Sequence, residues 1–191
     1  MSRARALLVA SLLFVAACGG EPPDKEMQQA QGAIDAARAA GADLYAAEEF
    51  AAAQAALSRA EDAVGARDYR LALDHALDSR QRAQNAAKLA ADGMASARVE
   101  ADRAITAAAA GINTLQARLK SAEALRLPAR ALTPPRQAVA DGDRRLQEAR
   151  AALDRSDYRG ARDSAAAANT ALTAARTDLE AAISAAARRR R

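Results

Sequence analysis

Apolar residues recur every seven positions along two stretches of the chain. In the first stretch the larger ones are Phe50, Leu57 and Val64, with Ala53 and Ala60 between them. Residues three, four and seven positions apart lie on one face of an α-helix. The spacing therefore predicts a helix with a narrow apolar seam, of the kind that packs against another helix.

The same pattern returns 89 positions further along. Val139, Leu146 and Leu153 replace the three larger residues, and Gly142 and Ala149 lie between them. A repeat at a fixed offset is the sequence signature of a duplicated structural unit. We therefore expect two related halves.

A short turn follows each seam at the same offset. It reads Arg67-Asp68-Tyr69 in the first copy and Ser156-Asp157-Tyr158 in the second. An aspartate side chain accepts hydrogen bonds from the free amides of a first helical turn, so Asp68 and Asp157 are predicted N-caps. The pattern indicates a tight reversal between antiparallel helices.

The helices after these turns continue the seam with small residues. They are Ala76, Ala83, Ala90 and Ala97 in the first copy, and Ala165, Leu172, Leu179 and Ala186 in the second. Alanine is the best helix former but buries little apolar area. We expect thin, closely packed helices rather than a thick core.

One further helix precedes each pair. Residues 24–40 form the first and end at Gly41-Ala42-Asp43. Residues 98–125 form the second and end at Leu127-Pro128, because proline disfavours helix in the residue before it. The sequence predicts that the chain restarts at Thr133-Pro134-Pro135, with the threonine as N-cap and proline in the first turn.

The expected fold is all-α, an elongated antiparallel helical bundle of two related up-down-up units. We place the first unit at 24–92 and the second at 93–187, with a basic tail at 188–191. Two arrangements stay open between the units, namely one long helix over 68–125 or a break near Asp92-Gly93. One glycine does not decide between them, since it costs a helix interior only about 1 kcal/mol.

The N-terminus has the pattern of a secretory signal peptide over residues 1–17. Arg3 and Arg5 precede an apolar run that is too short to span a bilayer, which needs roughly 20 residues. The run ends in Val15-Ala16-Ala17-Cys18, which resembles the lipobox of bacterial lipoproteins. The resemblance implies cleavage before Cys18 and lipidation of that cysteine. The alternative is an ordinary signal peptide with a chance cysteine.

Residues 18–23 have the glycine and proline composition of a short tether. In many lipoproteins an aspartate just after the cysteine retains the protein in the inner membrane, and Gly19 stands there in this chain. The resemblance therefore implies a lipid-anchored protein of the cell envelope, in the outer membrane facing the periplasm rather than in the inner membrane.

Charge and composition argue against several kinds of partner. The chain has 28 basic and 24 acidic residues, but Arg3 and Arg5 lie in the signal peptide and four more bases form the tail Arg188 to Arg191. The rest of the chain is slightly acidic and shows no basic face for nucleic acid. We expect no nucleic-acid partner.

The residue set for catalysis is sparse. His75 is the one histidine and Cys18 the one cysteine, so the chain lacks the ligands of a zinc site and a Cys/His nucleophilic pair. Its carboxylates lie in helices rich in arginine, where surface ion pairs are the simpler interpretation. We expect no catalytic residue, metal, cofactor or small-molecule substrate. Tyr69 and Tyr158 either pack over their turns or serve as partner contacts.

A family resemblance is found in two places of the sequence. One is the stretch from Ala36 to Phe50, which contains Gly41-Ala42-Asp43-Leu44-Tyr45, and the other is Asp68-Tyr69. It resembles alanine-rich envelope lipoproteins with the domain of unknown function numbered 4398. The resemblance covers residues 30–92 well and 134–180 more weakly. That family commonly has proline where Ala47 stands. Some relatives continue into a peptidoglycan-binding domain, which we do not expect here.

The expected function is that of a non-catalytic, lipid-anchored scaffold, adaptor or spacer in the cell envelope. It would act through its helix faces on an envelope protein, or by self-association. The alternative is a periplasmic binding or chaperone-like module for unfolded clients or for the cell-wall polymer.

Overall fold

A computed structural model describes residues 21–189 of the chain. These residues form helices and no strand, so the predicted all-α helical bundle is confirmed. The predicted signal peptide, its cleavage residues Val15, Ala16 and Ala17, and the predicted lipidation site Cys18 lie outside the described residues. None of the described helices is both long enough and apolar enough to cross a membrane.

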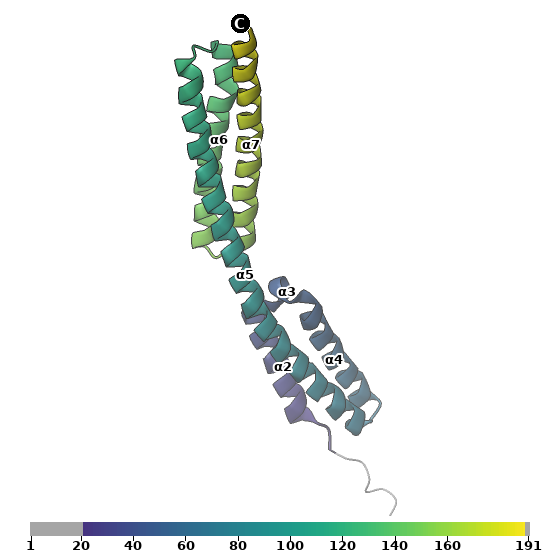
Figure 1. Cartoon of the computed structure of the whole chain (residues 1–191). Helices are drawn as coiled ribbons and strands as arrows, with labels where there is room; N and C mark the ends of the chain where they lie inside the picture. The colour runs from purple at the N-terminus through teal and green to yellow at the C-terminus, as the bar shows by residue number, and fades with distance from the viewer. Residues whose placement is uncertain (1–20, 190–191) are drawn as a thin grey trace, which may run out of the picture. The chain divides into compact units, whose positions relative to one another are not determined.

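The chain divides into two compact units after Gly93. The first unit contains α2 (Asp24–Ala39), α3 (Ala42–Tyr45) and α4 (Ala47–Gly65). The first part of α5 (Tyr69–Ala124) completes it. Figure 1 shows α2 and α4 lying along this part of α5, which makes a bundle of three long helices with α3 at one end.

The second unit is also a three-helix bundle. Its members are the second part of α5, α6 (Ala129–Asp154) and α7 (Tyr158–Arg189), which lie side by side in Figure 1. Helix α5 runs without interruption from Tyr69 to Ala124, so the structure has the continuous helix and not the break near Asp92-Gly93.

The predicted start of α6 is wrong. The helix begins at Ala129 after Pro128, and Thr133, Pro134 and Pro135 lie inside it. The Thr133 hydroxyl donates to the Ala129 carbonyl at 3.0 Å instead of capping a new helix. Proline's φ suits a helix, and what is lost is a hydrogen bond to the preceding turn. Leu132 and Pro135 are both buried, so packing of this first stretch overrides that loss.

Both seams shift by one residue at their C-terminal ends. Val64 and Leu153, the last predicted seam positions, are half-buried, whereas their neighbours Ala63 and Ala152 are buried. The buried face therefore includes the preceding alanine, and it does so at equivalent positions of the two copies.

The two predicted capping turns are confirmed. The Asp68 carboxylate accepts from the Leu71 amide, and the Asp157 carboxylate accepts from the Gly160 amide, each at 3.0 Å. The residue before each aspartate is left-handed, with φ of 60° at Arg67 and 61° at Ser156. This conformation reverses the chain without glycine.

The two cores differ in the size of their side chains. In the first unit, most buried residues are alanines, together with Ile34, Phe50 and Leu57. The second unit has larger residues, namely Ile112, Leu115, Leu119, Leu127, Leu132, Leu146, Leu172 and Leu179. Ser79 is the buried polar side chain among the described residues, and its hydroxyl donates to the Ala53 carbonyl of α4 at 2.9 Å.

Two helical glycines provide a test of the close packing. A Cβ at Gly32 would meet nothing within 4 Å, whereas one at Gly142 would lie 3.1 Å and 3.2 Å from the Cδ atoms of buried Leu172. We expect Gly32→Ala to raise the free energy of unfolding by about 0.5–1 kcal/mol through helix propensity. We expect Gly142→Ala to lower it by about 1 kcal/mol, because overpacking outweighs the same gain. Urea unfolding followed by circular dichroism measures both, and equal stabilisation would contradict the packing argument.

Candidate functional site

The first unit contains a helix break close to one of its ends. Gly41 has a φ of 80°, in the left-handed region that favours glycine, and it begins the single turn of α3. Ala46 then leaves the helical conformation, with φ of −141° and ψ of 41°, and α4 starts at Ala47. Ala47 is thus the first helical residue, a position that favours proline. This explains why proline fits there in the family that the sequence resembles.

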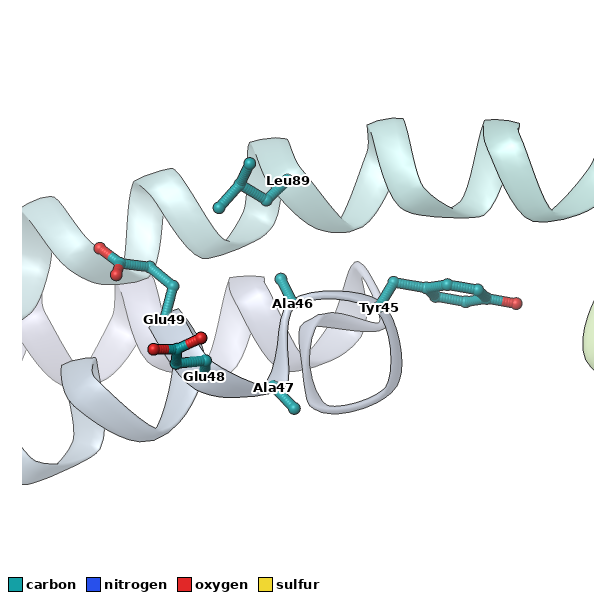
Figure 2. Close-up of a pocket in the computed structure, with 6 residues that line it drawn as sticks. All are labelled: Tyr45, Ala46, Ala47, Glu48, Glu49 and Leu89. Atoms are coloured by element: carbon teal, nitrogen blue, oxygen red, sulfur yellow. The ribbon is translucent and has the colours of Figure 1, made fainter.

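An open groove of about 540 Å³ lies at this break, and we call it the α3–α4 groove. Figure 2 shows its lining, with Leu89 on α5 and the other residues on the segment that runs from α3 into α4. The lining residues are Tyr45, Ala46, Ala47, Glu48, Glu49 and Leu89.

Gly93 permits the close approach of α5 to the end of α3. A Cβ at this position would lie 3.2 Å from both the Cβ and the carbonyl oxygen of Tyr45. The backbone of one helix therefore rests against the backbone of the other. Sequence reasoning treated Gly93 only as a candidate helix break, because its contact partner lies 48 positions away along the chain.

The polar wall of the groove is acidic. The Glu49 carboxylate lies 3.6 Å from the guanidinium of Arg82, which also donates from Nε to Asp78 at 3.0 Å. The hydrogen bond with Asp78, followed by the charge of Asp78, raises the pKa of Arg82 above its ordinary value. The Glu48 carboxylate makes no ion pair or hydrogen bond with any of residues 21–189. One carboxylate of the groove is therefore engaged and the next one is available.

The apolar wall is unusually exposed for a chain with so few large apolar residues. Leu89, which lines the groove, is 51% exposed. Leu44, which precedes the half-buried Tyr45 and does not line the groove, is 48% exposed. The groove thus combines uncovered apolar surface with a free negative charge.

The two tyrosines singled out in the sequence belong to different units. Tyr69 is half-buried at the start of α5, and Tyr158 is half-buried at the start of α7. Tyr158 packs against the small cluster of Ala101, Ala152 and Ala161. Their role as partner contacts stays a prediction, and neither tyrosine lines the α3–α4 groove.

The Tyr45–Gly93 contact can be tested by substitution. Gly93→Ala gains about 1 kcal/mol of helix propensity but forces apart two backbones, for which overpacking costs about 1–3 kcal/mol. We expect a net loss on the order of 1 kcal/mol in the free energy of unfolding. Gly65→Ala is the matched control, because a Cβ there meets nothing within 4 Å. Stabilisation by Gly93→Ala as large as that by the control would refute the contact.

Comparison with known proteins gives one match. Residues 25–102 match the model of a family described as Domain of unknown function (DUF4398). The match includes α2, α3, α4, the first part of α5 and therefore every residue of the α3–α4 groove. No curated protein and no solved structure matches the chain.

The family resemblance expected from Gly41, Tyr45, Phe50 and the Asp68-Tyr69 turn is thereby confirmed over the first unit. The weaker resemblance over 134–180 lies outside the match and stays a prediction. Residues 25–102 of this chain therefore match the DUF4398 family model.

Proposed function

We propose that this protein is a non-catalytic, lipid-anchored adaptor or scaffold of the bacterial cell envelope, which holds a protein partner in the α3–α4 groove. The observation that carries the proposal is the exposure of Leu89 in the groove of a protein that buries mainly alanine. Complete burial of a leucine contributes about 1.5–3 kcal/mol relative to exposure. A large apolar side chain left uncovered in this groove favours a partner that covers it.

The chemistry of the groove defines the partner. A hydrophobic side chain of the partner would cover the apolar wall, and a lysine or arginine of the partner would pair with the free carboxylate of Glu48. An amphipathic helix or extended segment with one basic residue close to its apolar face meets both requirements.

The described residues also support the non-catalytic part of the proposal. The buried polar side chain among them, Ser79, is engaged by a backbone carbonyl. The α3–α4 groove is open to solvent, whereas a site that works by acid–base or electrostatic catalysis excludes water and perturbs the groups inside it.

A second candidate function is a periplasmic chaperone-like or binding module. The observation that favours it is a set of exposed large apolar residues outside the groove, at Leu71, Leu77, Val99 and Leu125. Scattered apolar contacts suit many weak clients better than one specific partner.

The lipid anchor rests on the sequence around Cys18, and it leads to a separate test. We expect Cys18→Ser to move the protein from the membrane fraction to the soluble envelope fraction, because two or three acyl chains are what gives stable anchoring. Metabolic labelling with an alkyne fatty acid should label the wild type and not the variant. Ala16→Gly, which keeps a small residue before the cysteine, is the control. Equal membrane binding of Cys18→Ser and the wild type would contradict lipidation.

The adaptor proposal is tested by site-specific photocrosslinking in cells. A photoreactive residue replaces Leu89 in the groove or Leu77 on another face of the same helix, two positions of comparable exposure. We expect one dominant protein adduct from position 89, identified by mass spectrometry, and a much weaker one from position 77. Glu48→Lys should reduce that adduct at least fivefold, since a buried or partly buried charge pair contributes about 1 kcal/mol or more.

Glu61→Lys carries the same change of charge on an exposed position of α4 and should leave the adduct intact. Many unrelated adducts from both positions would support the chaperone-like module instead. Adducts to a second copy of the chain would support a structural oligomer. No adduct from position 89 would contradict the adaptor proposal.

A further inference from the structure

The second unit has a polar notch between α5 and α7, separate from the α3–α4 groove. Its volume is about 210 Å³. The residues that line it are chiefly Gly111 and Thr114 from α5 and Asn169, Leu172, Thr173 and Arg176 from α7.

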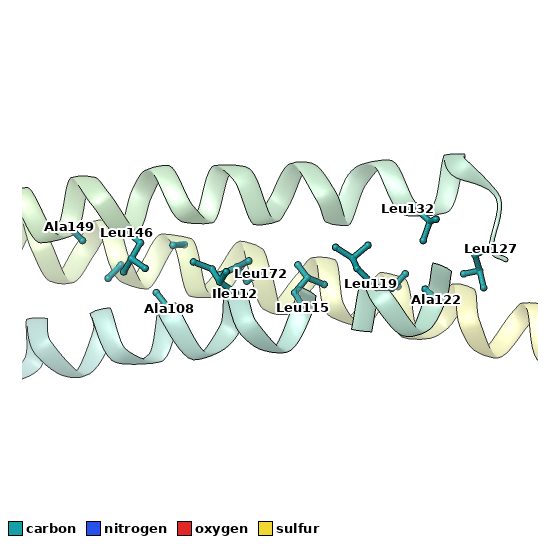
Figure 3. Packing of buried hydrophobic residues seen from close by; sticks show 13 residues of the cluster. Ala108, Ile112, Leu115, Leu119, Ala122, Leu127, Leu132, Leu146, Ala149 and Leu172 are labelled. Carbon is teal, nitrogen blue, oxygen red and sulfur yellow. The ribbon is translucent and has the colours of Figure 1, made fainter. Parts of the chain in front are cut away.

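Glycine creates the space for this notch. A Cβ at Gly111 would lie 3.1 Å from Oδ1 of Asn169 and 3.4 Å from Cδ1 of Leu172. Figure 3 shows Leu172 turned into the core beside Ile112, so the apolar layer forms the floor. The polar residues next to Leu172 on α7 lie above that floor. Glycine rather than alanine in a helix interior costs about 1 kcal/mol of stability.

Two polar side chains of the notch donate no hydrogen bond. Within residues 21–189, the Asn169 amide and the Arg176 guanidinium donate no hydrogen bond. The Nε of Arg176 is the one buried side-chain nitrogen or oxygen in this part of the chain that lacks a hydrogen-bond partner. A buried donor without an acceptor costs about 1–3 kcal/mol. The Thr114 hydroxyl donates a hydrogen bond to the Ala110 carbonyl at 2.8 Å.

The charge balance around the notch is positive. Glu180 lies 3.9 Å from the Nε of Arg176 and 3.6 Å from the Nε of Arg118, so two cations share one carboxylate. Arg176 is only partly covered, with 44% of its side chain exposed. One positive charge is therefore left over beside the unengaged amide.

The notch is not a by-product of the duplicated architecture. At the offset of 89 positions, Asn169, Thr173 and Arg176 correspond to Arg80, Gln84 and Ala87 of the first unit. Arg80 donates to Gln29 at 2.6 Å, and Ala87 has no polar group. The same helix positions in the first unit thus hold an engaged arginine and an alanine where the second unit has Asn169 and Arg176.

We propose that the notch binds a small oxyanion group, the carboxylate or phosphate of a larger ligand. The guanidinium of Arg176 supplies the charge and donors, which match a planar or tetrahedral oxyanion. The Asn169 amide and the Thr173 hydroxyl supply further donors, and Leu172 closes the floor. Binding gives these donors an acceptor within hydrogen-bond distance, which Glu180 at 3.9 Å from the Nε of Arg176 does not provide. This inference is independent of the adaptor proposal, because the groove and the notch share no residue.

Nuclear magnetic resonance on the full, ¹⁵N-labelled chain in mild detergent tests the inference. The probes are sodium acetate and inorganic phosphate, with acetamide as the neutral counterpart of acetate, all at constant ionic strength. We expect saturable shifts of the Gly111 backbone amide and the Asn169 side-chain amide, with a Kd on the order of 1–10 mM. Gly32, in the other unit, is the reference and should not move.

Arg176→Gln should weaken binding about tenfold, which is the effect of one charge-assisted hydrogen bond. Asn169→Ala, which leaves the charge unchanged, should weaken it severalfold. Arg150→Gln makes the same charge change on an exposed position of α6 and should have no effect. Saturation by acetate alone assigns a carboxylate, and saturation by phosphate alone assigns a phosphate. Equal shifts with acetamide, or unchanged affinity in Arg176→Gln, would overturn the proposal.

Discussion

Close approach of helices through alanine is the constraint on which the rest of this structure depends. A buried alanine removes little apolar area from water, so each contact contributes little to stability. The fold compensates by length, since α5 alone has 56 residues and repeats the small contact many times. Its surface ion pairs add little to this, because exposed pairs contribute about 0–1 kcal/mol each. The same closeness gives Gly93, Gly111 and Gly142 a role, since a Cβ at each would make a tight contact with another helix.

Both candidate sites arise from this constraint. In the first unit, Gly93 brings α5 against the end of α3, and the helix break at Ala46 then leaves a groove that the short alanines do not fill. In the second unit, Gly111 leaves a notch above Leu172. Large side chains would have filled either space. A core of small residues therefore leaves surface recesses wherever a helix bends or a glycine replaces a side chain.

The sequence predicted the features that depend on local chemistry. The end of α2 just before Gly41 and the two aspartate caps, which lie 89 residues apart, follow from capping rules and periodicity, and the structure has them. The start of α6 was wrong because burial of Leu132 and Pro135, a tertiary effect, outweighs the local preference of two prolines. The groove and the notch were not predicted at all. Each needs a pair of residues far apart in the sequence, Tyr45 with Gly93 and Gly111 with Asn169, and a seam of alanines carries no signal that pairs them.

A seam of identical small residues poses a problem of register. If one helix slides by seven residues past its neighbour, an alanine replaces an alanine at many contacts, so the slip changes few contacts of the seam. The hydrogen bond from Ser79 to Ala53 does not prevent this slip, because its acceptor is a backbone carbonyl and the same shift brings another carbonyl of α4 to that place. In the second unit the insertion of Leu172 opposite Gly142 does oppose a slip, since every other alignment places a side chain against the leucine. The second bundle, whose core also holds larger side chains, therefore fixes the alignment of its helices more strongly than the first.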